Sequence, residues 1–327
     1  MKQVVMAGPR KTKIIEVDVP KIKDNEVLVK VTYTGMCHSE LNTFLFGKDG
    51  EEIGHEAVGV VAEVGKEVKG FQVGDRVTGL GGGGFKEYIV MVPDKMVHVP
   101  DSIKDEDAIV EPLACILSAC IKISPKVCGD SVAVIGAGYM GLGAISLFKA
   151  MGYGDIIAVD IRKEARDNAL RFGATEVYAP EELPLHYLLN WETWEKPDLK
   201  RDGHVTDIFH LGFERVLEFS GTQSGLNLAG EMVCAHGLMG IGGFHNDCDR
   251  TVDFKLWNMK AATMINCHER RIEYEATLCQ RAIELIERGM WQFKGVTNHI
   301  YEMGELDRGF MDMESHANGF IKGAVRC

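Results

Sequence analysis

Residues 132–141 read Val-Ala-Val-Ile-Gly-Ala-Gly-Tyr-Met-Gly, a short apolar strand followed at once by glycines spaced Gly-x-Gly-x-x-Gly. A helical stretch continues through Met151, and a second apolar strand ends at Asp160, 19 residues after the last glycine. A glycine motif of this form is weak alone, but a strand, a helix and an acidic residue in register with it indicate a dinucleotide-binding unit. The stretch therefore predicts a doubly wound parallel sheet of the Rossmann type.

The three glycines have separate expected tasks. Gly136 permits the tight turn, Gly138 lets the backbone approach a pyrophosphate, and Gly141 lets the helix and the strand pack closely. The pyrophosphate would rest on the unpaired amides at the start of the helix, at Tyr139 and Met140.

Asp160 predicts the type of dinucleotide. Its carboxylate would accept both hydroxyls of the adenosine ribose and repel a 2′-phosphate, which favours NAD over NADP. Arg162 follows two residues later, and a guanidinium there is the one feature that opposes this preference.

The pattern on either side predicts two domains. Residues 1–100 are dense in short β-branched runs separated by turns, which is typical of an antiparallel β domain. From Val132 onward strands alternate with helical stretches, as in a parallel sheet with crossover helices. We expect an antiparallel β domain followed by a dinucleotide-binding domain. Residues 180–211, rich in Trp, Pro, His and charge, exceed a usual connection and predict an insertion with some structure of its own.

Composition excludes several classes of protein. The chain has 327 residues, 46% of them hydrophobic and 26% charged, and a formal net charge of −12, so it is an ordinary globular protein without a basic field for nucleic acid. Its nine cysteines include no Cys-x-x-Cys pair, which suits neither a disulfide framework nor a four-cysteine zinc site. The uncharged run from Ser131 to Phe148 contains the glycine turn, so we expect no membrane span. We expect a cytoplasmic protein.

A second group of residues has the donor types of a catalytic metal site. Cys37 is followed 18 residues later by His55 and Glu56, and Glu111 lies further along the chain. A thiolate, an imidazole and a carboxylate form a set of zinc ligands, and three protein ligands leave a fourth position for a substrate. Each residue alone is more often a packing or solvated residue.

At these residues the chain resembles the zinc-dependent medium-chain dehydrogenase/reductase family, in particular its sorbitol and threonine dehydrogenase branch. The resemblance covers nearly the whole length and rests on these motifs: Gly54-His-Glu-Ala-x-Gly59, Gly74-Asp-Arg-Val, Glu111-Pro-Leu-Ala, the glycine motif and the segment around Gly323. It implies a GroES-like catalytic β domain over residues 1–120, completed by 273–327. It also implies an NAD-binding Rossmann domain over residues 121–272, and one catalytic zinc.

The resemblance also implies roles for individual residues. Cys37 and His55 correspond to zinc ligands, Glu56 to the adjacent carboxylate, and Glu111 to a carboxylate that reaches zinc directly or through water. Ser39 matches the hydroxyl that passes on the substrate's proton. With a thiolate, a neutral imidazole and one carboxylate the zinc centre is neutral, whereas a second carboxylate would oppose alkoxide formation. We expect one glutamate at a time on the metal, and the sequence leaves open which.

Three features depart from the family pattern. Only seven residues separate Val77 from Phe85, so the lobe that carries a structural zinc in many members is missing. Asn42 stands where many relatives place a histidine that ends the proton relay, and an amide cannot take up that proton. His38 either contacts the pyrophosphate or completes the relay. The long segment 180–211 is the third departure.

The resemblance implies an oxidoreductase that transfers a hydride between NAD and a secondary alcohol. Its expected substrate is a polyol, cyclitol or amino alcohol, exchanged with the ketone, and its expected assembly is a homo-oligomer, a dimer or a tetramer. Two alternatives stay open: a zinc-free quinone or enoyl reductase of the same superfamily, and a nucleotide-binding protein without turnover.

Overall fold

Two compact units make up the described chain. The computed structural model describes residues 1–81, 83–195 and 211–327. One unit comprises residues 1–115 with 270–327, and the other comprises residues 116–269. The boundaries expected from the sequence were 120 and 273.

The first unit is built on a seven-stranded sheet in which β3, β4, β5 and β7 follow one another, β15 and β14 extend the β3 edge, and β6 also pairs with β3. All its pairings are antiparallel except the one between β14 and β15. Strands β1 and β2 form a separate antiparallel pair. The strands of this unit are β1 (Lys2–Gly8), β2 (Lys11–Glu16), β3 (Val27–Gly35), β4 (Glu56–Val64), β5 (Arg76–Gly79), β6 (Tyr88–Met91), β7 (Met96–His98), β14 (Thr297–Glu302) and β15 (Lys322–Arg326).

Alternating valines explain why this sheet forms. Val27, Val29 and Val31 of β3 are buried against Ala57 and Val61 of β4, as expected for strands with one face in a core. The helices that accompany the sheet are α1 (Leu41–Phe46), α8 (Ile272–Glu287) and α9 (Leu306–Ser315), together with the start of α2 (Val110–Lys122), which continues into the second unit.

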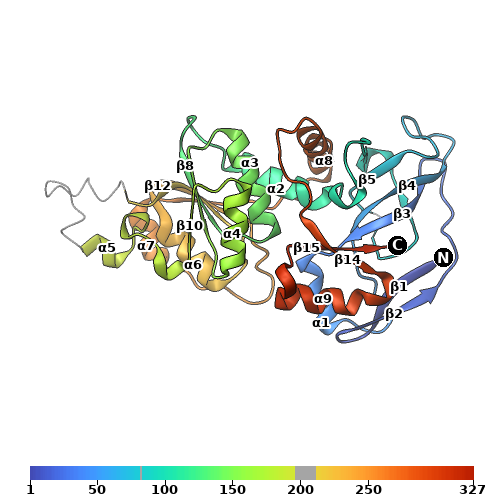
Figure 1. Ribbon diagram of the computed structural model, residues 1–327, viewed down its shortest axis with the longest axis horizontal. Helices are drawn as coiled ribbons and strands as arrows, with labels where there is room; N and C mark the ends of the chain where they lie inside the picture. Colours follow the sequence, from blue (N-terminus) through green and yellow to red (C-terminus); the bar gives the residue numbers. More distant parts are fainter. Residues whose placement is uncertain (82, 196–210) are drawn as a thin grey trace. The chain divides into compact units, whose positions relative to one another are not determined.

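The second unit contains a six-stranded, wholly parallel sheet with the order β10-β9-β8-β11-β12-β13. Figure 1 labels β8, β10 and β12 of this sheet. Its strands are β8 (Ser131–Ile135), β9 (Asp155–Val159), β10 (Glu176–Tyr178), β11 (Phe213–Glu218), β12 (Val233–Ile241) and β13 (Thr263–Asn266). Its helices are α3 (Tyr139–Met151), α4 (Lys163–Phe172), α5 (Trp191–Glu195), α6 (Gln223–Met232) and α7 (Phe254–Lys260). The strand order reverses at β8, so a ligand crevice is expected at the carboxyl end of that strand. The predicted fold class is confirmed.

The uncharged run from Ser131 to Phe148 is divided between β8 and α3. Helix α3 begins after Gly138 and ends at Gly152, which has a φ of +89° and closes the helix in the left-handed conformation. Within the described residues, no helix combines the length and the apolar character needed to cross a membrane.

The long segment after β10 is partly described. Two short 3-10 helices, Pro180–Glu182 and Leu185–Tyr187, precede α5. The rest of the predicted insertion, residues 196–210, lies outside the described residues. Between β5 and β6 the chain has only residues 80–87, without a cysteine.

Candidate active site

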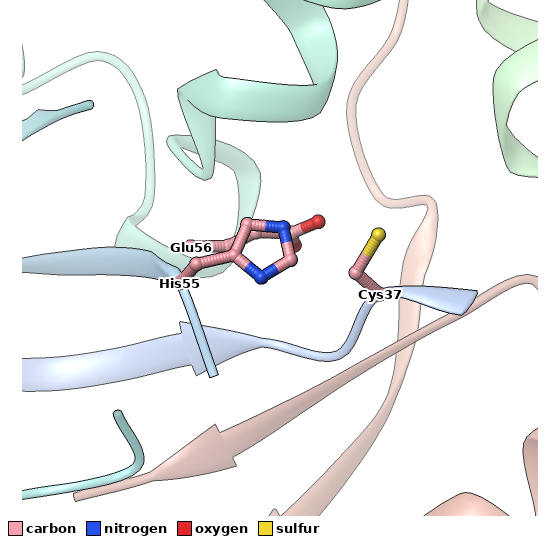
Figure 2. Close-up of side chains that lie close together, drawn as sticks. All are labelled: Cys37, His55 and Glu56. Carbon is pink, nitrogen blue, oxygen red and sulfur yellow. The ribbon is translucent and has the colours of Figure 1, made fainter. Parts of the chain in front are cut away.

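Three predicted metal ligands meet in the first unit. Cys37 follows β3, and His55 stands just before Glu56, the first residue of β4. Because Gly35 of β3 pairs with Glu56, the two strands bring these residues to one place. One ligand atom from each of Cys37, His55 and Glu56 lies within 4.8 Å of the other two, and Figure 2 shows the three side chains together.

The buried carboxylate of Glu40 orients two of the three ligands. Its Oε1 lies 2.8 Å from Nδ1 of His55, and its Oε2 accepts a hydrogen bond of 3.1 Å from the backbone amide of Cys37. Since Nδ1 is engaged, Nε2 is the ring nitrogen left for a metal. A carboxylate behind a ligating histidine fixes the ring and raises its basicity.

The charges of the cluster favour protonated ligands when no cation is bound. Burial alone would lower the pKa of His55, but hydrogen bonds to Cys37 and Glu40 and the charges of Glu40 and Glu56 raise it to about 12. Burial and the charge of Glu56 raise the pKa of the Cys37 thiol. Because a metal binds the neutral imidazole and the thiolate, binding has to displace these protons.

Glu56 presents two unlike oxygens. Its Oε2 accepts a hydrogen bond of 2.5 Å from Nζ of Lys322, the first residue of β15. Its Oε1 is buried and has no hydrogen-bond partner among the described residues. A buried carboxylate oxygen without a partner is costly, and a metal beside Cys37 and His55 would satisfy it. The donor set of thiolate, imidazole and carboxylate therefore fits zinc.

Glu111 belongs to a neighbouring cluster. The ligand atoms of Glu111 and Cys115, one turn apart on α2, and of Glu275 on α8 lie within 4.8 Å of one another. Cys115 donates to Glu275 at 3.4 Å and to Glu111 at 3.8 Å. Burial and the charge of Glu56 raise the pKa of Glu111 to about 7. The structure thus places Glu56, rather than Glu111, with Cys37 and His55.

The three expected relay positions lie around Cys37. The hydroxyl of Ser39 donates a hydrogen bond of 3.2 Å to the sulfur of Cys37. His38 is exposed in the same 3-10 helix, His38–Glu40, and Asn42 is exposed on α1. Ser39 therefore contacts a predicted metal ligand directly.

In the second unit, each glycine of the motif has its own environment. Gly136 has a φ of +90°, and a Cβ there would lie 2.6 Å from the amide nitrogen of Ser220. A Cβ on Gly141 would overlap the carbonyl oxygen of Gly136. A Cβ on Gly138, by contrast, would meet nothing nearer than the guanidinium of Arg162 at 4.0 Å. The protein itself requires Gly136 and Gly141, whereas the open space at Gly138 fits a phosphate group at the start of α3.

Asp160 follows β9 at the same edge of the sheet. Its carboxylate accepts hydrogen bonds from the amides of Ala137 at 2.9 Å and Arg162 at 2.8 Å. The Arg162 side chain also pairs with it, with Nε 3.3 Å from Oδ1. Tyr139 and Met140 are half-buried in the first turn of α3. The fold thus brings the predicted nucleotide residues together.

Glu40 and Lys322 are site residues that the sequence analysis missed, as is Glu275. No sequence motif marks Glu40 as a site residue, because its role depends on a contact with His55 that only the folded chain makes. Lys322 had a weak signal: in the sequence it stands among the apolar residues of Phe320-Ile-Lys-Gly-Ala-Val325, where a lone charge needs a partner.

Two family models match the chain. The model described as "Alcohol dehydrogenase GroES-like domain" matches residues 23–101, and the one described as "Zinc-binding dehydrogenase" matches residues 140–288. The first contains Cys37, His55 and Glu56, and the second contains Gly141 and Asp160.

Individual proteins are similar over different lengths. Sorbitol dehydrogenase of Bacillus subtilis is 32% identical over 216 residues, which cover 54% of this chain and 60% of that protein. A probable D-xylulose reductase A of Arthroderma otae is 27% identical over 95% of this chain and 93% of its own. The crystal structure of galactitol-1-phosphate dehydrogenase from Escherichia coli superposes with a TM-score of 0.80 at 23% identity, covering 99% of both chains.

Proposed function

The chain belongs to the zinc-dependent medium-chain alcohol and polyol dehydrogenases, and from this premise we propose that it transfers a hydride between NAD and a secondary alcohol at a single zinc. The observation that carries the proposal is the meeting of Cys37, His55 and Glu56, with one buried oxygen of Glu56 left unpartnered. A zinc-free reductase would not need three metal-binding side chains around one point.

The residues of the first unit would hold the metal and move the proton. Cys37, Nε2 of His55 and Oε1 of Glu56 are the proposed ligands, and Glu40 keeps the ring of His55 in place. Zinc held there supplies a Lewis acid that brings the pKa of an alcohol towards neutrality. The hydroxyl of Ser39 is proposed to accept the alcohol's proton and pass it on.

The residues of the second unit would hold NAD, which supplies the hydride acceptor. The amides of Tyr139 and Met140 at the start of α3 are proposed to bind the pyrophosphate, with room made by Gly138. Asp160 is proposed to bind the ribose hydroxyls in place of its present amide partners, with Arg162 beside the adenosine.

The substrate is proposed to be a polyol, cyclitol or amino alcohol. Glu111 and Glu275 offer carboxylate oxygens in one cluster with Cys115, and Glu111 lies close enough to the proposed ligands for the charges of Glu56 and His55 to act on it. Such carboxylates accept hydrogen bonds from hydroxyl or ammonium groups. Sorbitol and D-xylulose, in the names of two relatives, belong to this chemical class. A homo-oligomer and a cytoplasmic location stay predictions.

Zinc analysis with NADH formation on a panel of secondary alcohols tests the proposal. We expect one zinc per chain, and we expect Cys37→Ala to lose both zinc and turnover while it still binds NAD, because the nucleotide residues lie in the other unit. Cys115→Ala, a half-buried cysteine outside the proposed ligands, should keep its zinc. Two zinc ions per chain, or turnover in the Cys37 variant, would contradict the proposal.

Cofactor choice is a separate prediction. We expect NAD to be preferred over NADP by at least about tenfold, about 1.4 kcal/mol, and Asp160→Ala to narrow that ratio. Asp167→Ala, on the exposed side of α4, is the matched control and should leave the ratio unchanged. Equal use of NADP by the unmodified protein would mean that Arg162 neutralises the 2′-phosphate.

A further inference from the structure

A buried ion pair joins the proposed metal site to the C-terminal strand. Nζ of Lys322 lies 2.5 Å from Oε2 of Glu56, and the two residues are only 5% and 1% exposed. They are the first residues of β15 and β4, the two strands that flank β3. Gly35 at the end of β3 makes the approach possible, since a Cβ there would overlap Oε2 of Glu56.

Because of this ion pair, the two oxygens of Glu56 differ in the partners that they contact. Lys322 occupies Oε2, while Oε1 is buried without a partner among the described residues. A carboxylate with both oxygens free could bind a metal through either or both. With Oε2 engaged, Glu56 has one oxygen to offer to a metal beside Cys37 and His55.

Lys322 also changes the charge of the centre. Nζ of Lys322 is buried 2.5 Å from a carboxylate oxygen, so the two groups form an ion pair and the side chain brings one positive charge to the site. Zinc with the thiolate of Cys37, neutral His55 and the carboxylate of Glu56 sums to zero. Glu40, whose carboxylate contacts His55, adds one negative charge, so the sum is −1 without Lys322 and 0 with it. The positive charge of Lys322 therefore favours a substrate oxygen that has lost its proton.

We propose that Lys322 is a positioning residue for the metal centre: it restricts Glu56 to one metal-binding oxygen and offsets the charge of that carboxylate. The inference rests on the proposed zinc function. It adds a residue from the other end of the chain, whose role is to keep the centre acidic enough to bind a deprotonated alcohol.

Three substitutions separate the two parts of this role. Lys322→Arg keeps a charge and a donor, Lys322→Gln keeps a donor without the charge, and Lys322→Met removes both. Lys260→Met is the matched control, because Lys260 is also fully buried but lies in the other unit. Each variant is compared with the unmodified protein in thermal unfolding, zinc affinity by chelator competition, the visible spectrum of the cobalt-substituted form, and the pH profile of kcat.

We expect Lys322→Met and Lys322→Gln to keep their zinc, within about tenfold of the original affinity, because the lost lysine charge repelled the metal. In these two variants the apparent pKa that governs kcat should rise by at least about one unit. In Lys322→Arg, which keeps the charge, this pKa should stay at its original value. The cobalt spectrum should change in Lys322→Met, where Glu56 gains its second oxygen, and stay unchanged in Lys260→Met.

Two results would overturn the inference. Loss of zinc by more than about tenfold in Lys322→Gln would show that the lysine only supports the fold of the site. An unchanged cobalt spectrum and an unchanged pH profile in a folded Lys322→Met protein would show that it does not act on the metal. If the unmodified protein oxidised no alcohol, the proposed function would fail, and the cobalt spectra and zinc affinities would still test the role of Lys322.

Discussion

The two units fix their candidate sites by different physical means. In the first unit, side-chain pairs hold the ligands: Glu40 with half-buried His55, and Lys322 with Glu56 in a fully buried pair. In the second, backbone geometry forms the site, through the turn at Gly136 and the close approach at Gly141. A site made of charge pairs fails when a charge loses its partner, whereas a site made of backbone fails when an added atom overlaps it. Substitutions in each unit can test this difference.

The largest loss of NAD affinity is expected where an added methyl group would overlap the backbone. Gly141→Ala places a Cβ against the carbonyl oxygen of Gly136, so the first turn of α3 has to shift away from β8. We expect NAD affinity to fall at least about 100-fold, about 2.7 kcal/mol, and the melting temperature to fall as well. Isothermal titration calorimetry and thermal unfolding measure the two effects.

Gly138→Ala is the matched control for that variant. A Cβ at this position meets only Arg162 at 4.0 Å, so the stability of the NAD-free protein should stay within about 0.5 kcal/mol. NAD affinity should fall by about tenfold, because the methyl group enters the space proposed for the pyrophosphate. If Gly138→Ala bound NAD like the unmodified protein, that space would not hold the pyrophosphate.

A smaller effect is expected from Glu40→Gln in the first unit. The amide can still accept one hydrogen bond, but it no longer carries the charge that supports His55. We expect zinc affinity to fall by about 10- to 100-fold, with NAD affinity unchanged. Zinc affinity is measured by chelator competition, and Glu26→Gln, a carboxylate in the same unit paired with Lys23, is the control. Unchanged zinc affinity in Glu40→Gln would mean that the ring of His55 is oriented without this charge.

The same contrast explains what the sequence could predict. The backbone devices are local: Gly136, Gly138, Gly141 and Asp160 lie within one βαβ unit, so their spacing predicted both the fold and the nucleotide residues. The charge pairs are not local. Lys322 is 266 residues from Glu56, and only the folded sheet brings their strands to opposite sides of β3.

The metal ligands fall between these two cases. Cys37, His55 and Glu56 were found as a set because a resemblance joined separate motifs, and pairing of β3 with β4 then explains why they meet. The sequence left open whether Glu56 or Glu111 binds the metal. That choice depends on the neighbours that each carboxylate meets in space, Lys322 for Glu56, and Cys115 and Glu275 for Glu111, which no spacing along the chain encodes.

The smallest effect on activity is expected at the buried lysine of the second unit. Nζ of Lys260 donates to three backbone carbonyl oxygens, those of Gly230, Glu231 and Val233, at 2.6, 3.0 and 2.8 Å. Among the residues that the structure describes, no carboxylate pairs with Lys260 as Glu56 pairs with Lys322. Burial lowers the pKa of Lys260 to about 7. Its contacts bind the end of α6 and the start of β12, so it supports the fold rather than a site.

Lys260→Met should therefore leave kcat, zinc affinity and NAD affinity unchanged while it lowers the free energy of unfolding by about 1–3 kcal/mol, because buried carbonyl oxygens lose their donor.

This loss of unfolding free energy should depend on pH. Between about pH 7 and the ordinary lysine value of 10.5, the unfolded chain binds a proton that the folded protein has released, so the stability contributed by Lys260 rises with pH, by at most about 1.4 kcal/mol per unit. Urea unfolding of the unmodified protein and of Lys260→Met at pH 7 and pH 9 measures this dependence. The difference between their free energies of unfolding should be larger at pH 9. If the difference in the free energy of unfolding between the two proteins were the same at both pH values, the three carbonyl oxygens would keep Lys260 charged, as Glu56 does for Lys322. The two buried lysines would then differ only in where they lie.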